Sequence, residues 1–335
     1  MSEPQRASSK ERAASRDKDA MQYTIRHVTK FSYDEPISES VMEARMQPRS
    51  EAWQHCLRFG LSTAPPSRVR MYQDPDGNIV HHFNIPGRHS RLTVTAEAFV
   101  EVSAPQSLPD SLGPGAWEQI DTATATGEFW ESLNPSPFAR RTDLLNTLAQ
   151  EIGLERGEDP LGTVRRIMSD IFRRFEYAPQ STRVDSPIDD ALATRKGVCQ
   201  DFAHIMIALV RQIGVPCRYV SGYLFQPGGS GAGSIDGATH AWVEAWLPDL
   251  GWTGFDPTHD VTTGEHHIRV AVGRDYADVP PTRGVFKGLS AVRSELAVGV
   301  SIGTGQQHSD PTIFTPWMSR EASAPLVDAE SSQQQ

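Results

Sequence analysis

The spacing of apolar residues changes part-way along the second half of the chain, and this change restricts the folds that the chain can adopt. Up to residue 213 apolar side chains recur every three or four positions, which is the spacing of one helix face. Beyond it they alternate in short runs broken by turn residues, as strands do. The pattern predicts helices over residues 161–175 and 198–213, then strands over 218–225, 240–247 and 252–255. Helices followed by an antiparallel sheet indicate an α+β domain.

The first half of the chain, from Gln22 to Ser103, alternates in short runs throughout. The segment Asp74-Pro75-Asp76-Gly77-Asn78 separates two of these runs and is typical of a hairpin connection. We therefore expect an N-terminal antiparallel β domain. Prolines and glycines then cluster over residues 105–115 and 134–137, which predicts a connector with short helices.

These patterns predict the organisation of the whole chain. We expect a strand-rich stretch from Ile268 to about Ile302 to close the α+β domain. The expected parts are a disordered tail over residues 1–20, a β domain over 21–104, a connector over 105–158, the α+β domain over 159–305 and a polar tail over 306–335.

Composition and charge narrow the range of functions. The formal net charge of -10 argues against a phosphate-backbone partner, so we expect no nucleic-acid binding. The chain has no run of 18 apolar residues and its first 20 residues contain no apolar signal segment, so we expect a cytoplasmic protein with no membrane partner. Three cysteines form neither a disulfide framework nor a zinc site, which fits a reducing compartment.

Cys199 is the candidate nucleophile. It follows Gly197 at the start of a predicted helix, where the helix dipole favours a thiolate and free backbone N–H groups can bind an oxyanion. We expect the glycine to leave room for a substrate carbonyl. The competing interpretation is a buried helix cysteine, which is the usual environment of a free thiol.

His240 and Asp256 are the candidate base and orienting carboxylate. His240 lies on a predicted strand after a glycine-rich loop over residues 227–237, and Asp256 ends the returning strand before Pro257. Asp256 could accept a hydrogen bond from the imidazole, but pairing about the turn does not place the two residues directly opposite, so a diagonal contact or a bulge is needed. Taken singly, an exposed strand histidine and a turn-forming Asp-Pro are the competing interpretations.

Three segments together resemble the transglutaminase-like superfamily. They are Gly197-Val198-Cys199, His240-Ala241-Trp242-Val243-Glu244, and Gly251-Trp252 running to Asp256-Pro257-Thr258. Residues 199–204 and 269–276 are also similar to bacterial transglutaminase-like proteins that are proposed cysteine proteases and that carry an N-terminal β domain. The resemblance implies a papain/transglutaminase-like core, in which a nucleophile helix packs on an antiparallel sheet.

The resemblance also implies a Cys-His-Asp triad. Cys199 would be the nucleophile, His240 the acid and base, and Asp256 the residue that orients His240. Such an enzyme forms a thioester from a protein or peptide carboxamide and passes the acyl group to an amine or to water, without a cofactor. The sequence does not decide between transfer and hydrolysis, nor does it indicate an oligomeric state. The alternatives are a cysteine peptidase and a non-catalytic peptide-binding module that retains the fold.

The other reactive side chains have structural interpretations. Cys56 and Cys217 are interpreted as structural thiols, and His204 lies off the nucleophile's helix face, so we expect it to pack or hydrogen-bond locally. Glu244 could be a second carboxylate near the site, but we expect it to form a salt bridge on its strand. Adjacent histidines, as at positions 81–82 and 266–267, point to opposite faces of a strand, so we expect no metal site.

Two features of the acyl site stay open in the sequence. The oxyanion hole is expected to include the backbone N–H of Cys199, with Tyr177 as a candidate second donor. Trp242, Trp246 and Trp252 either wall the acyl site or fill the core.

Overall fold

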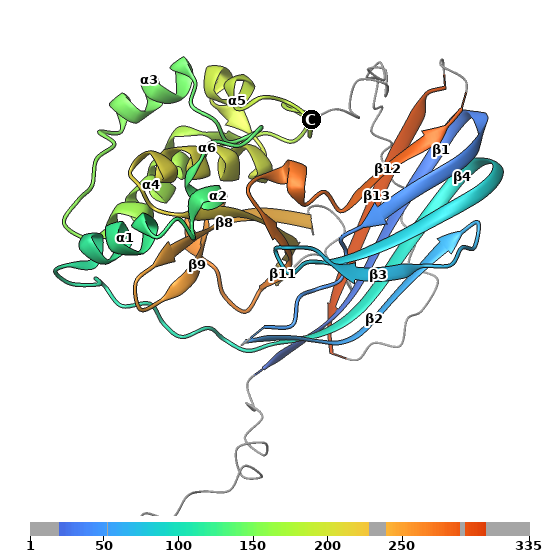
Figure 1. The fold of residues 1–335 in the computed structure, drawn as a ribbon, viewed down its shortest axis with the longest axis horizontal. Coiled ribbons are helices and arrows are strands. Elements are labelled where there is room, and N and C mark those ends of the chain that lie inside the picture. Colours follow the sequence, from blue (N-terminus) through green and yellow to red (C-terminus); the bar gives the residue numbers. More distant parts are fainter. Residues whose placement is uncertain (1–19, 52, 228–238, 289–291, 306–335) are drawn as a thin grey trace, which may run out of the picture.

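The computed structural model describes residues 20–51, 53–227, 239–288 and 292–305. These residues form an N-terminal sheet domain and a core of helices packed on a second sheet (Figure 1). The tails expected over residues 1–20 and 306–335, and the glycine-rich loop expected over 227–237, fall almost entirely outside the described residues.

The N-terminal sheet is antiparallel, as its alternating pattern predicts. Its strands from the first part of the chain are β1 (Met21–Ala44), β2 (Gln54–Ala64), β3 (Arg70–Gln73) and β4 (Ile79–Val102). The predicted hairpin connection is confirmed, because it joins β3 to β4 and the Asp74 N–H donates to the Asn78 carbonyl at 3.0 Å. The alternating runs after this turn belong to one strand, β4, which pairs with β1 along nearly its whole length.

Two late strands correct the predicted organisation. We expected residues up to 305 to close the α+β domain, but β12 (Thr282–Lys287) and β13 (Ser294–Thr304) both pair with β1 of the N-terminal sheet. The domain boundary predicted at residue 305 was therefore wrong. A strand's own alternation shows which face it buries but not which strand it joins, so a partner more than 200 residues away is not visible locally.

The core sheet has the strand order β10-β9-β8-β7-β11, with every pair antiparallel. The predicted helices and strands of this domain are confirmed, with ends shifted by one or two residues. The strands are β7 (Cys217–Leu224), β8 (Thr239–Leu247), β9 (Gly251–Asp256), β10 (Val261–Thr262) and β11 (His267–Gly273). The helices are α3 (Asp143–Glu151), α4 (Pro160–Arg174), α5 (Ile188–Thr194) and α6 (Cys199–Gln212). The remaining short elements are α1 (Ala116–Ala125), α2 (Trp130–Leu133), β5 (Glu176–Tyr177), β6 (Lys196–Gly197) and the 3₁₀ helix η1 (Tyr276–Asp278).

Helix α6 is the central helix of the core. Every residue from Gln200 to Arg211 is buried, because α6 packs against β8 and β7 and is covered by other helices, including α4 (Figure 1). It ends before Gly214, which adopts the left-handed backbone conformation (φ 81°) that a helix C-terminus commonly requires. Within the described residues, no helix combines the length and the apolar character needed to span a membrane.

Candidate active site

Cys199 is the first residue of α6 and is half-buried. The helix start is fixed by Asp201, whose carboxylate accepts hydrogen bonds from the Val198 N–H at 2.8 Å and from the Thr182 hydroxyl at 2.5 Å. Since the first N–H groups of a helix have no partner within it, this end can stabilise negative charge on a sulfur or an oxygen. The Cys199 thiol therefore lies at the N-terminal end of a helix, which is the position expected from the sequence.

The contacts around Gly197 give a different reason for a glycine at this position from the one expected. A Cβ atom at this position would lie 2.9 Å from Asp201 Oδ2 and 3.2 Å from the Phe202 ring. The absence of a side chain thus allows the first turn of α6 to fold back onto the preceding backbone. These contacts are with Asp201 and Phe202 of the same helix, and they do not concern the space for a substrate carbonyl.

His240 and Asp256 meet through a diagonal contact between neighbouring strands. The register that pairs Val243 with Phe255 continues to put Asp256 opposite Trp242, two positions from His240 on the same face. His240 Nε2 lies 2.8 Å from Asp256 Oδ2. The diagonal contact expected from the sequence is present, and no bulge interrupts the β8–β9 register.

The His240 imidazole lies between the thiol and the carboxylate. An ionised carboxylate only accepts hydrogen bonds, so Nε2 donates to Asp256 and Nδ1 is left for the Cys199 thiol. Burial disfavours the charged ring, but hydrogen bonds with Asp256 and with Cys199 outweigh it and raise the pKa of His240 to about 10. The ring can therefore hold a proton through the neutral pH range.

Asp256 accepts hydrogen bonds from three histidines. Besides His240, His259 Nδ1 lies 2.8 Å and His267 Nε2 lies 3.2 Å from Oδ2, while the Thr258 N–H donates to Oδ1 at 2.9 Å. Burial alone would raise the pKa of this fully buried carboxyl, but the three histidine hydrogen bonds hold it well below its usual range. The sequence interpretation missed His259 and His267. His259 could have been suspected from its position three residues after Asp256.

The same cluster contains donors that a metal ion could use. Ligand atoms of His240, Asp256 and His259 all lie within 4.8 Å of one another, and imidazole nitrogens and carboxylate oxygens are zinc ligands. The contacts at 2.8 Å that both rings make with the carboxylate are hydrogen bonds, and these already explain the arrangement.

The three side chains that were interpreted as structural have environments that fit this interpretation. They are Cys56, Cys217 and His204. Burial raises the pKa of Cys56 and of Cys217 to about 11 each. His204 is buried between Phe138 and Tyr219, at ring-centroid distances of 5.3 and 5.0 Å. Burial, with a smaller effect of a nearby arginine, lowers the pKa of His204 to about 3.

The salt bridge expected at Glu244 is confirmed. Arg218 lies 2.7 Å from Oε2 and Arg269 lies 3.0 Å from Oε1. Arg269 also lies 2.8 Å from Glu51 of the N-terminal domain, so the network joins the two domains.

The three tryptophans separate into two environments. Trp242 is buried beside the site, with its ring 6.1 Å from His240 and 5.3 Å from His267. Trp246 and Trp252 instead pack against Phe129.

Tyr177 lies beside the nucleophile helix. It is 49% exposed and pairs with Gly197 in the short parallel pairing of β5 and β6. Its role as a second oxyanion donor stays a prediction.

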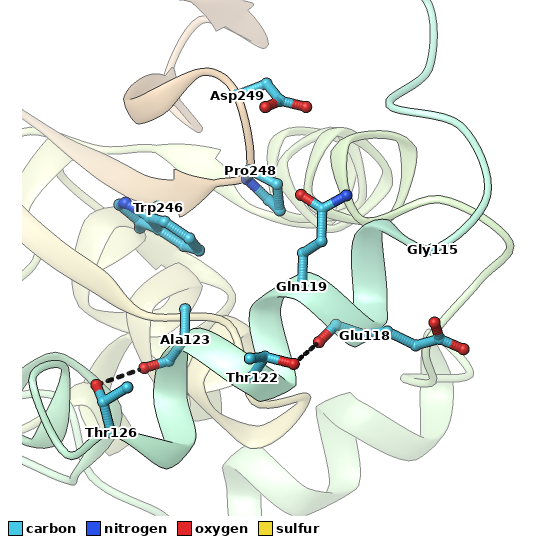
Figure 2. Close-up of a pocket in the computed structure, with 9 residues that line it drawn as sticks. All are labelled: Gly115, Glu118, Gln119, Thr122, Ala123, Thr126, Trp246, Pro248 and Asp249. Atoms are coloured by element: carbon cyan, nitrogen blue, oxygen red, sulfur yellow. Dashed lines mark hydrogen bonds between the residues drawn. The ribbon is translucent and has the colours of Figure 1, made fainter.

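A hollow of about 660 Å³ lies between α1 and the turn that joins β8 to β9 (Figure 2). Trp246 and Pro248 line it together with polar residues of α1 such as Gln119. Trp246 is six residues along β8 from His240, which corresponds to roughly 20 Å. This hollow is therefore separate from the candidate triad.

Comparison with protein families extends the resemblance to most of the chain. Residues 146–257, which contain Cys199, His240 and Asp256, match the transglutaminase-like superfamily, and residues 23–101 match the bacterial transglutaminase-like N-terminal region. An uncharacterized protein of Mycobacterium leprae is 34% identical over 278 residues, covering 82% of this chain and 96% of its own length. The chain belongs to the transglutaminase-like superfamily. An uncharacterized protein of Mycobacterium tuberculosis is likewise 36% identical over 279 residues, or 79% of this transglutaminase-like chain and 87% of the relative.

Two further comparisons relate this transglutaminase-like protein to named proteins. A protein-glutamine gamma-glutamyltransferase of Pseudomonas aeruginosa is 27% identical over 278 residues, which are 78% of this chain but 37% of that protein. The crystal structure of a proposed cysteine protease from Cytophaga hutchinsonii superimposes with a TM-score of 0.68, covering 90% of this chain and 94% of the other at 23% identity. This second likeness supports the fold.

Proposed function

We propose that this protein is a cysteine acyltransferase or amidase, in which Cys199 forms a thioester with a protein or peptide carboxamide. The observation that carries the proposal is the position of His240, which contacts both the Cys199 thiol and the buried Asp256 carboxylate. Nucleophilic acyl transfer needs a thiol, an imidazole that contacts the thiol, and a carboxylate that orients the imidazole.

The first half of the reaction forms the thioester. His240 Nδ1 holds the proton that the Cys199 thiol has given up, and the Cys199 sulfur attacks the carboxamide carbon, so that the carbonyl oxygen becomes an oxyanion. The N–H groups at the start of α6 stabilise that oxyanion. His240 then donates its proton to the departing nitrogen, the carbon–nitrogen bond breaks, and ammonia leaves when the donor is a primary carboxamide.

The second half transfers the acyl group. His240 removes a proton from an incoming amine or water, which attacks the thioester carbon, and the Cys199 thiol is released with that proton. Asp256 holds Nε2–H throughout and stabilises the charged ring. An amine acceptor gives a new amide, and water gives a carboxylate. The named activity of the Pseudomonas aeruginosa relative supports a protein glutamine as donor and transfer of its acyl group.

Selective labelling of Cys199 by iodoacetamide tests the proposal. With pKa values of about 11, Cys56 and Cys217 are thiolates in only about one molecule in ten thousand at pH 7. Peptide mass spectrometry should therefore find the label at Cys199 first, and His240→Ala should slow that labelling. The matched control is Cys56→Ala, which should leave the Cys199 rate unchanged. Labelling of Cys199 no faster than that of Cys56 would contradict the proposal.

Product analysis then separates the related functions. Incubation with a glutamine-containing peptide and a fluorescent amine should give a new amide bond and release ammonia, or ammonia alone if water is the acceptor. New α-amino groups from a cleaved peptide bond would instead identify a cysteine peptidase. A non-catalytic binding module would give none of these products and would bind its peptide equally well after Cys199→Ala.

A further inference from the structure

His267 donates a fixed hydrogen bond to the carboxylate of the candidate triad. Its Nδ1 accepts the Gly264 N–H at 3.2 Å and therefore carries no proton, so Nε2 is the nitrogen that donates to Asp256 at 3.2 Å. The ring is 5% exposed and packs edge-on against Trp242. Both the tautomer and the orientation of His267 are thus set by its surroundings, independently of His240.

His267 begins β11, and β11 is the edge strand of the core sheet that faces the N-terminal domain (Figure 1). Backbone N–H and C=O groups on the outer edge of β11 form hydrogen bonds with amide side chains of the N-terminal domain. These side chains occupy the place that a further strand would take. Gln54 donates to the Arg269 carbonyl and accepts from the Arg269 N–H, both at 2.8 Å. Asn78 makes the same pair of bonds with Val272, again at 2.8 Å. Both amides are 1% exposed.

Further contacts of the N-terminal domain hold the same strand. The Arg49 N–H also donates to the Arg269 carbonyl at 3.0 Å, and Glu51 pairs with the Arg269 side chain. At the start of β11, the Tyr23 hydroxyl lies 3.0 Å from Nδ1 of His266, the residue before His267. The domain therefore contacts this segment at positions 266, 269 and 272, while His267 points the other way, toward Asp256.

We propose that the N-terminal β domain positions the candidate triad through β11, with His267 as the positioning residue that holds Asp256 toward His240. The inference rests on the proposed function and gives the N-terminal domain a role within the same site. His259 offers a contrast, because it lies three residues after Asp256 and its side chain is 38% exposed. His259 can thus orient the carboxylate locally, whereas His267 ties it to another domain.

Substitutions at His267 test the first step. His267→Phe keeps an aromatic ring but removes the donor, and we expect the rate constant of Cys199 labelling to fall about 10- to 100-fold, with a shifted pH profile. His267→Gln places an amide N–H near the position of Nε2, and it should recover most of the rate and the original profile. Circular dichroism and thermal unfolding establish that both variants are folded. A folded His267→Phe protein with the wild-type rate and profile would overturn the inference.

Substitutions in the N-terminal domain test the second step. Asn78→Leu preserves side-chain size but loses both hydrogen bonds to β11, so we expect slower labelling of Cys199. The matched control is Asn84→Leu, because Asn84 is an exposed residue of β4, the strand that begins directly after Asn78, and its amide donates to Glu39. This control should label like the wild type. Equal labelling rates in the two variants would argue against any link from the domain to the site.

Nitrogen-15 histidine NMR of the Cys199→Ala protein gives a readout that does not depend on activity. The Nε2–H of His267 should appear as a slowly exchanging proton shifted downfield by its bond to a buried carboxylate. Asn78→Leu should move this resonance and speed its exchange, whereas Asn84→Leu should not. If Cys199 of the wild type shows no selective labelling but the resonance responds to Asn78→Leu, the proposed function fails while the structural link stands. An unchanged resonance in Asn78→Leu overturns the link itself.

Discussion

The buried ion network around Glu244 should make a single uncharged substitution costly. The Glu244 side chain is 3% exposed and faces Arg218 and Arg269, whose side chains are 19% and 7% exposed. Glu244→Gln keeps the shape, removes the charge and turns an amide donor toward an arginine. Breaking a buried pair by removing one partner costs about 3–5 kcal/mol. We expect about 3 kcal/mol, the lower end of that range, because Arg218 retains some water and Arg269 retains Glu51.

Urea denaturation followed by circular dichroism measures this cost. At roughly 2–4 °C per kcal/mol, the conversion for domains of about 150–250 residues, the melting temperature should fall by about 6–12 °C. The matched control is Glu97→Gln, because Glu97 pairs with Arg26 at 3.6 Å and its side chain is 55% exposed. A surface pair of this kind contributes about 0–1 kcal/mol. If Glu244→Gln loses no more stability than Glu97→Gln, the charges of the network do not stabilise the fold.

Three other perturbations have defined outcomes. Asp256→Asn should lower turnover by about 10⁴-fold in steady-state kinetics, because His240 loses the acceptor that fixes its tautomer, and a variant within tenfold of the wild type would refute that role. Burial keeps His27 and His204 neutral, with pKa values of about 4 and about 3, while unfolded histidines bind protons near pH 6.5. The stability they contribute is therefore complete above pH 6.5 and is lost as the pH falls, by up to about 1.4 kcal/mol per pH unit for each ring, which urea titrations at pH 7 and pH 5 would detect. Gly222→Ala should cost about 1–3 kcal/mol of unfolding free energy, because its Cβ would overlap a backbone carbonyl and an indole ring beside the site; a melting temperature equal to the wild type would refute this.

Local patterns predicted the core elements because their causes are local. The helical spacing before residue 213 and the turn between β8 and β9 are each encoded within about 15 residues, and both were found from the sequence. The Cys199, His240 and Asp256 positions followed from the same elements together with the family resemblance. The sequence also indicated that His240 and Asp256 could meet only through a diagonal contact or a bulge, because the loop length between their strands sets the register, and the structure has the diagonal contact.

Features that depend on distant pairing were not accessible in this way. Gln54 looks like any polar residue at a strand start, and only the folded chain brings it to the edge of β11, 215 residues later. From the sequence, His267 was interpreted only as one member of an adjacent pair of histidines. In the structure, the ring of His266 contacts Tyr23 of the N-terminal domain, whereas the ring of His267 contacts Asp256 of the core. The membership of β12 in the N-terminal sheet has the same cause, since alternation does not identify a partner.

The positions of β11 and its neighbours define the smallest unit that can hold the site. The family match over residues 146–257 includes Cys199, His240 and Asp256 but ends before β11. A fragment with those limits lacks His267 and exposes the edge of β7 that β11 covers, and unpaired strand edges are prone to non-native pairing. Extending the fragment through β11 exposes the Arg269 and Val272 backbone groups that the N-terminal amides satisfy. The N-terminal sheet is in turn completed by β12 and β13, which follow β11 in the chain. Each domain therefore needs strands or side chains supplied by the other part of the sequence, so we expect the two to fold and act as one unit.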